Sequence, residues 1–327
     1  MDRDALVQDW LTRQLRGRTF SLAPASADAS FRRYFRVTLR DETLVVMDAP
    51  PEREDCRPFI QVAGLMAAAG LNVPAVLAHD LARGFLLMTD LGSTTYLAAL
   101  NDGNADALFD DATDAMIRWQ LASRADILPV YDEALLRREL ALFPEWYLRC
   151  HLGIELDAGQ RQSLDVVFRL ILDSNLAQPR VYVHRDYMPR NLMLTDPNPG
   201  VLDFQDAVYG PITYDVASLF KDAFISWHEQ RVRDWTLRYW RRARAAGLPV
   251  NGDFGEFYRD CEWMGLQRHL KVLGIFARIC HRDGKPAYVK DTPRFLGYVR
   301  AVAERYASLA PLLHLLDDVC DRAAASG

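Results

Sequence analysis

The sequence predicts an α+β protein with a small β-rich N-terminal lobe over residues 1–91 and a larger, mainly helical C-terminal lobe over residues 92–327. Two patterns carry this prediction. The first ninety residues alternate short strand-like runs with helical segments, whereas residues 105–178 and those beyond 215 place apolar side chains at helical spacing. A short strand-rich segment, residues 181–204, separates the two helical regions. A chain of 327 residues also suits two lobes better than one compact domain.

Local patterns locate the elements of the small lobe. Residues 4–15 carry apolar side chains on one face of a helix, and a second helix is expected at residues 55–69, ended by Gly70. Strands are expected at residues 19–23, 32–39, 43–48, 73–79 and 84–88. Strands interrupted by a helix are typical of a small α+β lobe.

Composition excludes several classes of protein. The formal net charge of −5 argues against the concentrated basic face that binds nucleic acid. The longest apolar run, residues 62–71, is too short to span a membrane, and the N-terminus lacks the apolar core of a signal peptide. We therefore expect a cytoplasmic protein with neither a membrane nor a nucleic-acid partner. A monomer is expected as well, although the sequence pattern does not determine the oligomeric state. Scattered cysteines without a C-x-x-C pair fit reduced thiols, and the histidines show no zinc-ligand spacing.

One segment carries the residue types that phosphoryl transfer needs. His184-Arg185-Asp186 is followed, after four residues, by Asn191, which matches the kinase pattern H-R-D-x-x-x-x-N in type and spacing. Asp203 and the phenylalanine after it follow a short apolar strand, at the place of the kinase D-F-G motif. The joint pattern is much rarer by chance than an isolated H-x-D. It predicts a kinase-like active site on a two-lobed, protein-kinase-like fold.

The residues of this pattern have distinct predicted roles. Asp186 would orient the attacking hydroxyl and accept its proton. Asn191 and Asp203 offer the hard oxygen ligands that hold Mg²⁺ against the phosphates of ATP. We interpret His184 as a brace of the loop and not as a base.

The sequence resembles the aminoglycoside phosphotransferase and choline kinase group of kinase-like enzymes, and in particular the bacterial N-acetylmuramate/N-acetylglucosamine kinases of cell-wall recycling. The segments that carry the resemblance are residues 29–36, 45–50, 87–92, 184–191, 202–207, 210–215 and 265–271. The resemblance implies ATP-dependent phosphorylation of the anomeric hydroxyl of an amino sugar. It also implies that Asp215 braces the catalytic loop. From its position Asp215 is separately expected to be a helix N-cap, and the two interpretations are compatible.

A protein kinase is disfavoured on separate grounds. Only eleven residues lie between Asp203 and Asp215, and no A-P-E motif follows. This interval leaves little room for an activation segment that carries a phosphorylation site.

Two features depart from the kinase pattern. The expected phosphate loop, residues 23–30, has no glycine, and the slot of the phosphate-binding lysine holds Met47. The chain has four lysines, all beyond residue 220: Lys221, Lys271, Lys285 and Lys290. A small-lobe lysine therefore cannot bind the phosphates.

An arginine is the expected replacement for this lysine. Alternation along residues 31–37 places Arg33 on the more apolar face of a strand, where an unpaired charge is costly. Its partner is expected to be Asp48 or a nucleotide phosphate. We predict that Arg33 binds phosphate and is oriented by Asp48, with Arg32 as the alternative if the register shifts by one residue. Arg36→Ala should then do little, and a purely structural Arg–Asp pair is the competing interpretation.

The remaining site residues are expected from their places next to these motifs. We expect Ser30, Met88 and Asp90 to contact the nucleotide. For the sugar we expect Gln205 and Asp206, just past the metal-binding aspartate. Helical residues that could complete the sugar site are Glu145, Arg268 and Arg278.

Two other functions remain open at this point. One is a kinase for a different small alcohol, such as an aminoglycoside, choline or homoserine. The mixed, partly basic segments 143–147 and 263–271 instead favour a neutral or anionic sugar. The other is a nucleotide-binding pseudokinase that acts as a regulatory module, which the missing lysine suggests and the intact Asp186, Asn191 and Asp203 oppose.

Overall fold

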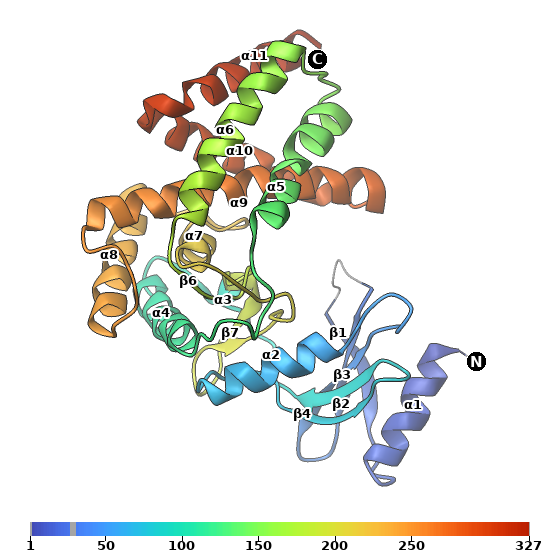
Figure 1. Ribbon diagram of the computed structural model, residues 1–327. Helices are drawn as coiled ribbons and strands as arrows, with labels where there is room; N and C mark the ends of the chain where they lie inside the picture. Colours follow the sequence, from blue (N-terminus) through green and yellow to red (C-terminus); the bar gives the residue numbers. More distant parts are fainter. Residues whose placement is uncertain (1, 27–30, 327) are drawn as a thin grey trace. The chain divides into compact units, whose positions relative to one another are not determined.

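The computed structural model describes residues 2–26 and 31–326 (Figure 1). The chain forms two compact units. Unit 1 comprises Met1–Trp119 and Pro189–Ala207, and unit 2 comprises Gln120–Met188 and Val208–Gly327. The chain therefore passes from unit 2 into unit 1 within the catalytic loop, and returns after Ala207. These units do not coincide with the lobes expected over residues 1–91 and 92–327, whose boundary stays a prediction.

Unit 1 combines a sheet with helices. Its elements are α1 (Arg3–Gln14), β1 (Ser21–Ser26), β2 (Arg33–Thr38), β3 (Thr43–Asp48), α2 (Arg57–Ala68), β4 (Val76–Asp80), β5 (Phe85–Thr89), α3 (Tyr96–Ala99), most of α4 (Ala105–Leu121), the 3₁₀ turn η2 (Pro189–Asn191), β7 (Leu192–Met193) and β8 (Gly200–Val201).

Unit 2 is mainly helical. Its elements are α5 (Glu133–Leu140), the π-helix η1 (Phe143–His151), α6 (Ala158–Leu176), β6 (Arg180–Val183), β9 (Val208–Pro211), α7 (Tyr214–Phe220), α8 (Glu229–Ala245), α9 (Phe254–Asp283), η3 (Pro286–Asp291), α10 (Thr292–Arg305), η4 (Ala307–Leu309) and α11 (Ala310–Ser326). The predicted α+β class is confirmed, since an N-terminal antiparallel sheet is combined with a larger helical part.

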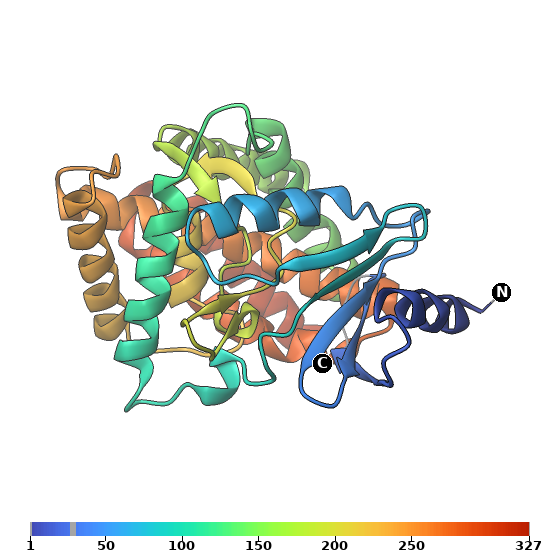
Figure 2. The same ribbon diagram turned by 90° about the horizontal axis from the view of Figure 1, so that it is seen from below.

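In the described part of unit 1, five antiparallel strands pair in the order β1-β2-β3-β5-β4. α1 lies along one side of this sheet in both views (Figures 1 and 2). Val7, Trp10 and Leu11 of α1 pack there with side chains from β2, β3 and β5, such as Val37 and Val46. Burial of these side chains holds α1 on this face.

The strand register decides which side chains share a face. Arg33 pairs with Asp48, which in turn pairs with Phe85, a member of the α1-covered core. Because successive side chains alternate between faces, Met88 lies on the opposite face of the sheet. The register therefore places Arg33 on the α1-covered face and Met88 on the other.

The segment 189–207 belongs to unit 1 through its packing. β7 pairs with β8, and the ring of Phe204 lies 4.7 Å from that of Phe59 on α2. Phe204 is fully buried. The contact with α2 thereby fixes the backbone next to Asp203.

The long helix α9, orange in Figure 1, is the centre of unit 2 and packs against α5, α6, α7, α8, α10 and η1. Gly274 on α9 permits a close approach of the segment between α5 and η1, because a Cβ atom there would lie 2.4 Å from the backbone of Leu142. β6 and β9 form a two-stranded ribbon that leads into His184. None of the helices in the described ranges is long and apolar enough to cross a membrane.

Candidate active site

The catalytic loop begins where β6 ends, and a buried carboxylate fixes its backbone. Asp215 accepts hydrogen bonds from the backbone N–H groups of His184 at 2.7 Å and Arg185 at 3.0 Å. Burial raises the pKa of Asp215 to about 7 against the effect of these bonds. Asp215 is the second residue of α7, whose N-cap position is occupied by Thr213. The N-cap interpretation is thus wrong, and the bracing contact is confirmed.

His184 also has the bracing position expected of it. Its ring is fully buried, and its Nδ1 accepts the backbone N–H of Asp186 at 3.3 Å. Arg185, between them, adopts a left-handed conformation with φ of +77°. Hydrogen bonds therefore hold the backbone N–H groups of His184, Arg185 and Asp186. They fix the position of the backbone from which the Asp186 side chain extends.

The two predicted metal ligands meet in unit 1. Asn191 Nδ2 lies 3.3 Å from Asp203 Oδ2, and the amide of Gln205 donates to Asp203 Oδ1 at 2.9 Å. Asp203 has a φ of +62°, and the N–H of Leu202 binds the carbonyl of Asn191 at 2.9 Å. The structure therefore brings Asn191, Asp203 and Gln205 together, whereas Asp186 belongs to unit 2.

This donor set fits Mg²⁺. Asn191 and Asp203 carry hard oxygen atoms, and Oε1 of Gln205 is buried with no hydrogen-bond partner among the described residues. Mg²⁺ normally takes one or two protein carboxylate or amide oxygens and completes its shell with phosphate oxygens and water. Over the residues that the structure describes, no group of three His, Cys, Asp or Glu side chains could hold a metal by itself.

Arg32 lies close to the segment that carries the two predicted metal ligands. Its Nη2 donates to Glu54 Oε2 at 3.0 Å, and its side chain is largely buried. Burial lowers the pKa of Arg32, but the charges of Tyr34, Glu54 and Asp206 outweigh it and raise the pKa. Asp206, expected to bind sugar, is thus placed near an arginine of the same unit.

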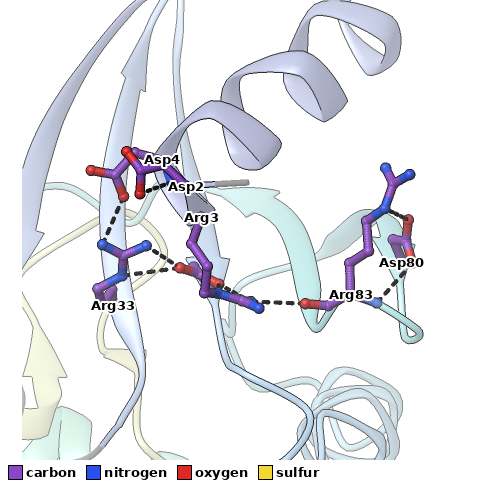
Figure 3. A network of polar contacts seen from close by, with 7 residues as sticks. Asp2, Arg3, Asp4, Arg33, Asp80 and Arg83 are labelled. Atoms are coloured by element: carbon purple, nitrogen blue, oxygen red, sulfur yellow. Dashed lines mark hydrogen bonds and ion pairs between the residues drawn. The ribbon is translucent and has the colours of Figure 1, made fainter.

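Arg33 is paired with Asp48, as predicted. Its Nε lies 2.9 Å from Asp48 Oδ2, and its Nη1 lies 2.7 Å from Asp4 Oδ1 (Figure 3). Arg3 binds the other oxygen of Asp48 at 2.9 Å through Nε, so two arginines neutralise one fully buried carboxylate. Because Arg33 and Met88 lie on opposite faces of the sheet, the structure does not bring these two predicted nucleotide ligands together. The phosphate role of Arg33 stays a prediction, and the structural pair is the interpretation that the contacts favour.

Asp90 contacts an arginine of β2. Arg36 Nε lies 2.6 Å from Asp90 Oδ2, and Arg36 Nη2 donates to the carbonyl of Gly92 at 2.7 Å. Burial raises the pKa of Asp90, but hydrogen bonds from Arg36, Thr43 and the Gly92 N–H, together with the charge of Arg36, outweigh burial and lower the pKa. The strand pattern suggested that Arg36→Ala would have little effect. Arg36 instead binds the segment after β5 through Asp90 and Gly92, so its substitution is not a neutral control. Ser30 lies outside the described residues.

The helical candidates for the sugar site lie in unit 2. Glu145 is exposed on η1, and its carboxylate lies 3.8 Å from Arg149. Arg268 is only 2% exposed, contacts Met188 Sδ at 3.7 Å through Nη2, and has a buried Nη1 without a partner among the described residues. Arg278 is half-buried on α9, where burial and the charge of Arg282 lower its pKa.

Sequence reasoning missed Glu139 and the role of Lys271. Glu139 Oε1 lies 2.5 Å from Arg185 Nη2 and 3.0 Å from Lys271 Nζ. Lys271 falls within a segment that carries the family resemblance, but nothing in the sequence pattern around Glu139 marked it. Both side chains are buried, so Lys271 contributes no free positive charge to a sugar pocket.

A family model described as "Phosphotransferase enzyme family" matches residues 21–249. The chain belongs to this family. This chain is 59% identical over 295 residues to the N-acetylmuramate/N-acetylglucosamine kinase of Pseudomonas aeruginosa, and the match covers 90% of this chain and 87% of that protein. It is 51% identical over 321 residues to the kinase of the same name from Neisseria meningitidis serogroup B, covering 97% and 96%.

Solved structures support the same fold at low sequence identity. The gentamicin complex of APH(2")-IIa has a TM-score of 0.61 at 15% identity, covering 90% of this chain and 97% of that chain. ADP-bound aminoglycoside phosphotransferase APH(2'')-Ib has a TM-score of 0.58 at 16% identity, with the same coverage. The predicted kinase-like fold of this phosphotransferase family member is thereby confirmed.

The ion pairs of Glu139 predict a pH-dependent contribution to stability. Burial raises the pKa of Glu139, but Lys271 and Arg185 outweigh it and lower the pKa to about 2, below the ordinary value of 4.5. The stabilisation is therefore fully present above pH 4.5 and is lost as the pH falls towards 2. We expect Glu139→Gln to lower the free energy of unfolding by about 3–5 kcal/mol at neutral pH, since it leaves buried cations uncompensated.

Urea unfolding of the wild type and Glu139→Gln at neutral pH and at pH about 4 measures this difference. The difference in free energy of unfolding between the wild type and Glu139→Gln should be smaller at the lower pH. Glu133→Gln, on the exposed side of the same helix, is the matched control and should change little at either pH. A gap that stays constant between the two pH values contradicts the low pKa of Glu139.

Proposed function

We propose that this phosphotransferase transfers the γ-phosphate of ATP to the anomeric hydroxyl of N-acetylmuramate or N-acetylglucosamine, giving the sugar 1-phosphate in peptidoglycan recycling. The observation that carries the proposal is identity of 51–59% to N-acetylmuramate/N-acetylglucosamine kinases over 90% or more of this chain. The residue types needed for the reaction, Asp186, Asn191 and Asp203, are all present. We propose that the enzyme acts as a cytoplasmic monomer.

In the proposed reaction Asp186 accepts a hydrogen bond from the anomeric hydroxyl and takes its proton as that oxygen bonds to the γ-phosphorus. The bond between the γ-phosphorus and the bridging oxygen breaks, and ADP leaves. Asn191 and Asp203 would hold Mg²⁺, which supplies neutralisation of the phosphate charge. Gln205 keeps Asp203 oriented by its amide hydrogen bond. In this role Gln205 acts on the metal ligand, while sugar contacts from Gln205 and Asp206 remain part of the proposal.

The assignment of Asp186 leads to a direct test of function. Wild-type protein incubated with ATP, Mg²⁺ and N-acetylmuramate should give a product whose ³¹P–¹H couplings place phosphate on the anomeric carbon. Asp186→Asn should lower kcat by about 10²–10⁴-fold and leave nucleotide binding intact, which is the usual effect of removing a general base.

Excess EDTA should abolish turnover of the wild type. ADP binding without turnover of any amino sugar would instead favour the pseudokinase alternative. Turnover of aminoglycosides, choline or homoserine alone would move the assignment to another small alcohol. Near-normal kcat in Asp186→Asn would show that another group is the base.

We propose that Arg32, rather than Arg33, takes the place of the missing lysine. Arg32 precedes β2 with the face parity of Tyr34, so it belongs to the Met88 side of the sheet. It pairs with Glu54 just before α2, which parallels the lysine–glutamate pair that kinases require. The charge of Asp206, three residues after the metal ligand Asp203, also acts on it.

Methionine substitutions distinguish the two arginines. Arg32→Met should raise KM for ATP roughly 10–100-fold, the effect of about 1.5–3 kcal/mol from a charged hydrogen bond. Arg33→Met should lower the melting temperature and leave KM for ATP within about twofold, because its partners are Asp48 and Asp4. The exposed Arg40 provides a control substitution. An increase in KM with Arg33→Met but not with Arg32→Met would return the phosphate role to Arg33.

We propose that Arg278 is the residue that binds the carboxylate of N-acetylmuramate. Its Nε is buried with no hydrogen-bond partner among the described residues. Burial and the charge of Arg282 lower its pKa, and the opposing charges of Asp283 and Glu145 do not outweigh them. A partly buried guanidinium with an unpartnered N–H group is stabilised strongly by an anionic ligand, which pairs its charge and accepts its hydrogen bond. Arg268 is less suited because its Nη1 is covered and its Nη2 contacts Met188.

Comparison of two sugars tests Arg278. Arg278→Gln should raise KM for N-acetylmuramate about tenfold and leave KM for the uncharged N-acetylglucosamine within about twofold. Arg282→Gln, one turn further along α9 and exposed, is the control. Equal changes for both sugars would remove Arg278 from the carboxylate site, and a selective change with Arg268→Gln would assign that site to Arg268.

A further inference from the structure

A buried cluster behind the catalytic loop has no role in the mechanism so far. We call Tyr131, Glu139, Arg185, Gln267 and Lys271 the Glu139 cluster. Glu139 accepts from Arg185 Nη2 at 2.5 Å, Lys271 Nζ at 3.0 Å and Gln267 Nε2 at 3.1 Å, and also from the Tyr131 hydroxyl. All five residues belong to unit 2, and every partner donates to the same carboxylate.

The arrangement of charges shows what this carboxylate does. Glu139 is 7% exposed in its side chain and Lys271 is 8% exposed, so neither is screened by water. Arg185 and Lys271 are both attracted by Asp186 as well as by Glu139. Without Glu139, two buried cations would face each other beside the catalytic carboxylate. Such a group would rearrange to reach a new counter-ion, and Asp186, whose charge already acts on both cations, is the carboxylate that the catalytic loop carries.

The backbone of Arg185 has an unfavourable conformation that its contacts hold in place. Its φ of +77° lies in the left-handed region, which is strained for a residue with a Cβ atom. Asp215 binds the backbone N–H of Arg185, and Glu139 binds its guanidinium, which also lies over the Tyr131 ring at 5.5 Å. The residue directly before Asp186 is thus held at both its backbone and its side-chain end.

We propose that Glu139 is a positioning residue of the phosphotransfer reaction. By binding Arg185 it keeps the left-handed turn before Asp186, and it stops the Arg185 guanidinium from pairing with the Asp186 carboxylate that must accept the proton. Glu139 itself touches neither substrate nor nucleotide in this role. The proposal rests on the proposed function, because it takes Asp186 as the base.

The test separates positioning from a purely structural contribution. Glu139→Gln should lower kcat at least about tenfold and leave KM for ATP within about twofold, since the loop and not the nucleotide contacts are disturbed. Glu133→Gln on the same helix should match the wild type in both values. Because Glu139 acts through Arg185, the double variant Glu139→Gln/Arg185→Gln should be no slower than the slower single variant.

Amide hydrogen exchange supplies a readout that does not depend on activity. Exchange in a peptide covering residues 181–188 should be faster in Glu139→Gln than in the wild type or Glu133→Gln at equal global stability, set by adding urea to the controls. If Glu139→Gln does not fold, Glu139→Asp keeps the charge but is too short to reach Arg185 and Lys271 together. Glu139→Asp should show the same decrease in kcat and the same faster exchange of residues 181–188, each smaller than in Glu139→Gln.

Three outcomes overturn the proposal. The first is a folded Glu139 variant with kcat within about twofold of the wild type, and the second is unchanged exchange of residues 181–188. The third is a multiplicative loss of kcat in the double variant, because it would show that Glu139 and Arg185 act independently. A wild type that phosphorylates no amino sugar overturns the proposed function instead, and the exchange comparison still decides whether Glu139 holds the loop.

Discussion

The active loop of this phosphotransferase depends on one interaction, the acceptance of two successive backbone N–H groups by the buried carboxylate of Asp215. The loop leaves β6 and must turn sharply, so its N–H groups lose their strand partners. A buried N–H without an acceptor is costly, and a single carboxylate at the start of α7 satisfies both. The left-handed Arg185 is the conformational consequence, and the Glu139 cluster is the side-chain counterpart of the same anchor.

Unit 1 also contains a buried carboxylate, but arginine side chains bind it in place of backbone N–H groups. There the buried carboxylate is Asp48, and Arg3 and Arg33 bring charge to it from α1 and β2. Arg3 Nη2 also donates a hydrogen bond to the carbonyl of Arg83 at 2.8 Å, so α1 is bound to the turn before β5 as well as to the core of the sheet. An isolated buried carboxylate would be strongly destabilising, and this pairing explains why the α1-covered face carries charged residues at one end.

Much of the fold, and the residues of the contact between Asn191 and Asp203, could be predicted from the sequence. Strand alternation located β3 at its observed bounds, and the joint spacing of Asp186, Asn191 and Asp203 pointed to one chemistry. Pairing of Arg33 with Asp48 also followed from the pattern. The phosphate role given to Arg33 depended on which face of the sheet the nucleotide would use, and alternation reveals two faces without saying which one a helix covers. α1 covers the Arg33 face, and only the packing of Trp10 and Leu11 makes that known.

Glu139 could not have been found from the sequence, for a different reason. Its partners lie 46 and 132 residues away, and on α5 it occupies a position that reads as part of an ordinary amphipathic helix. The Asp215 contact spans 31 residues, but the family resemblance had indicated it. Long-range polar contacts are set by how helices pack, and in this protein Gly274 brings α9 and the segment after α5 close together.

The counter-ion of Arg185 has a consequence for control of the enzyme. In protein kinases the activation segment is often ordered by a phosphate group that pairs with arginine, so catalysis waits for a modification. Here the negative charge opposite Arg185 is encoded in α5 and is present as soon as the chain folds. The order of this loop therefore does not depend on an added phosphate at Arg185, and the rate of an enzyme built in this way would follow the supply of its two substrates.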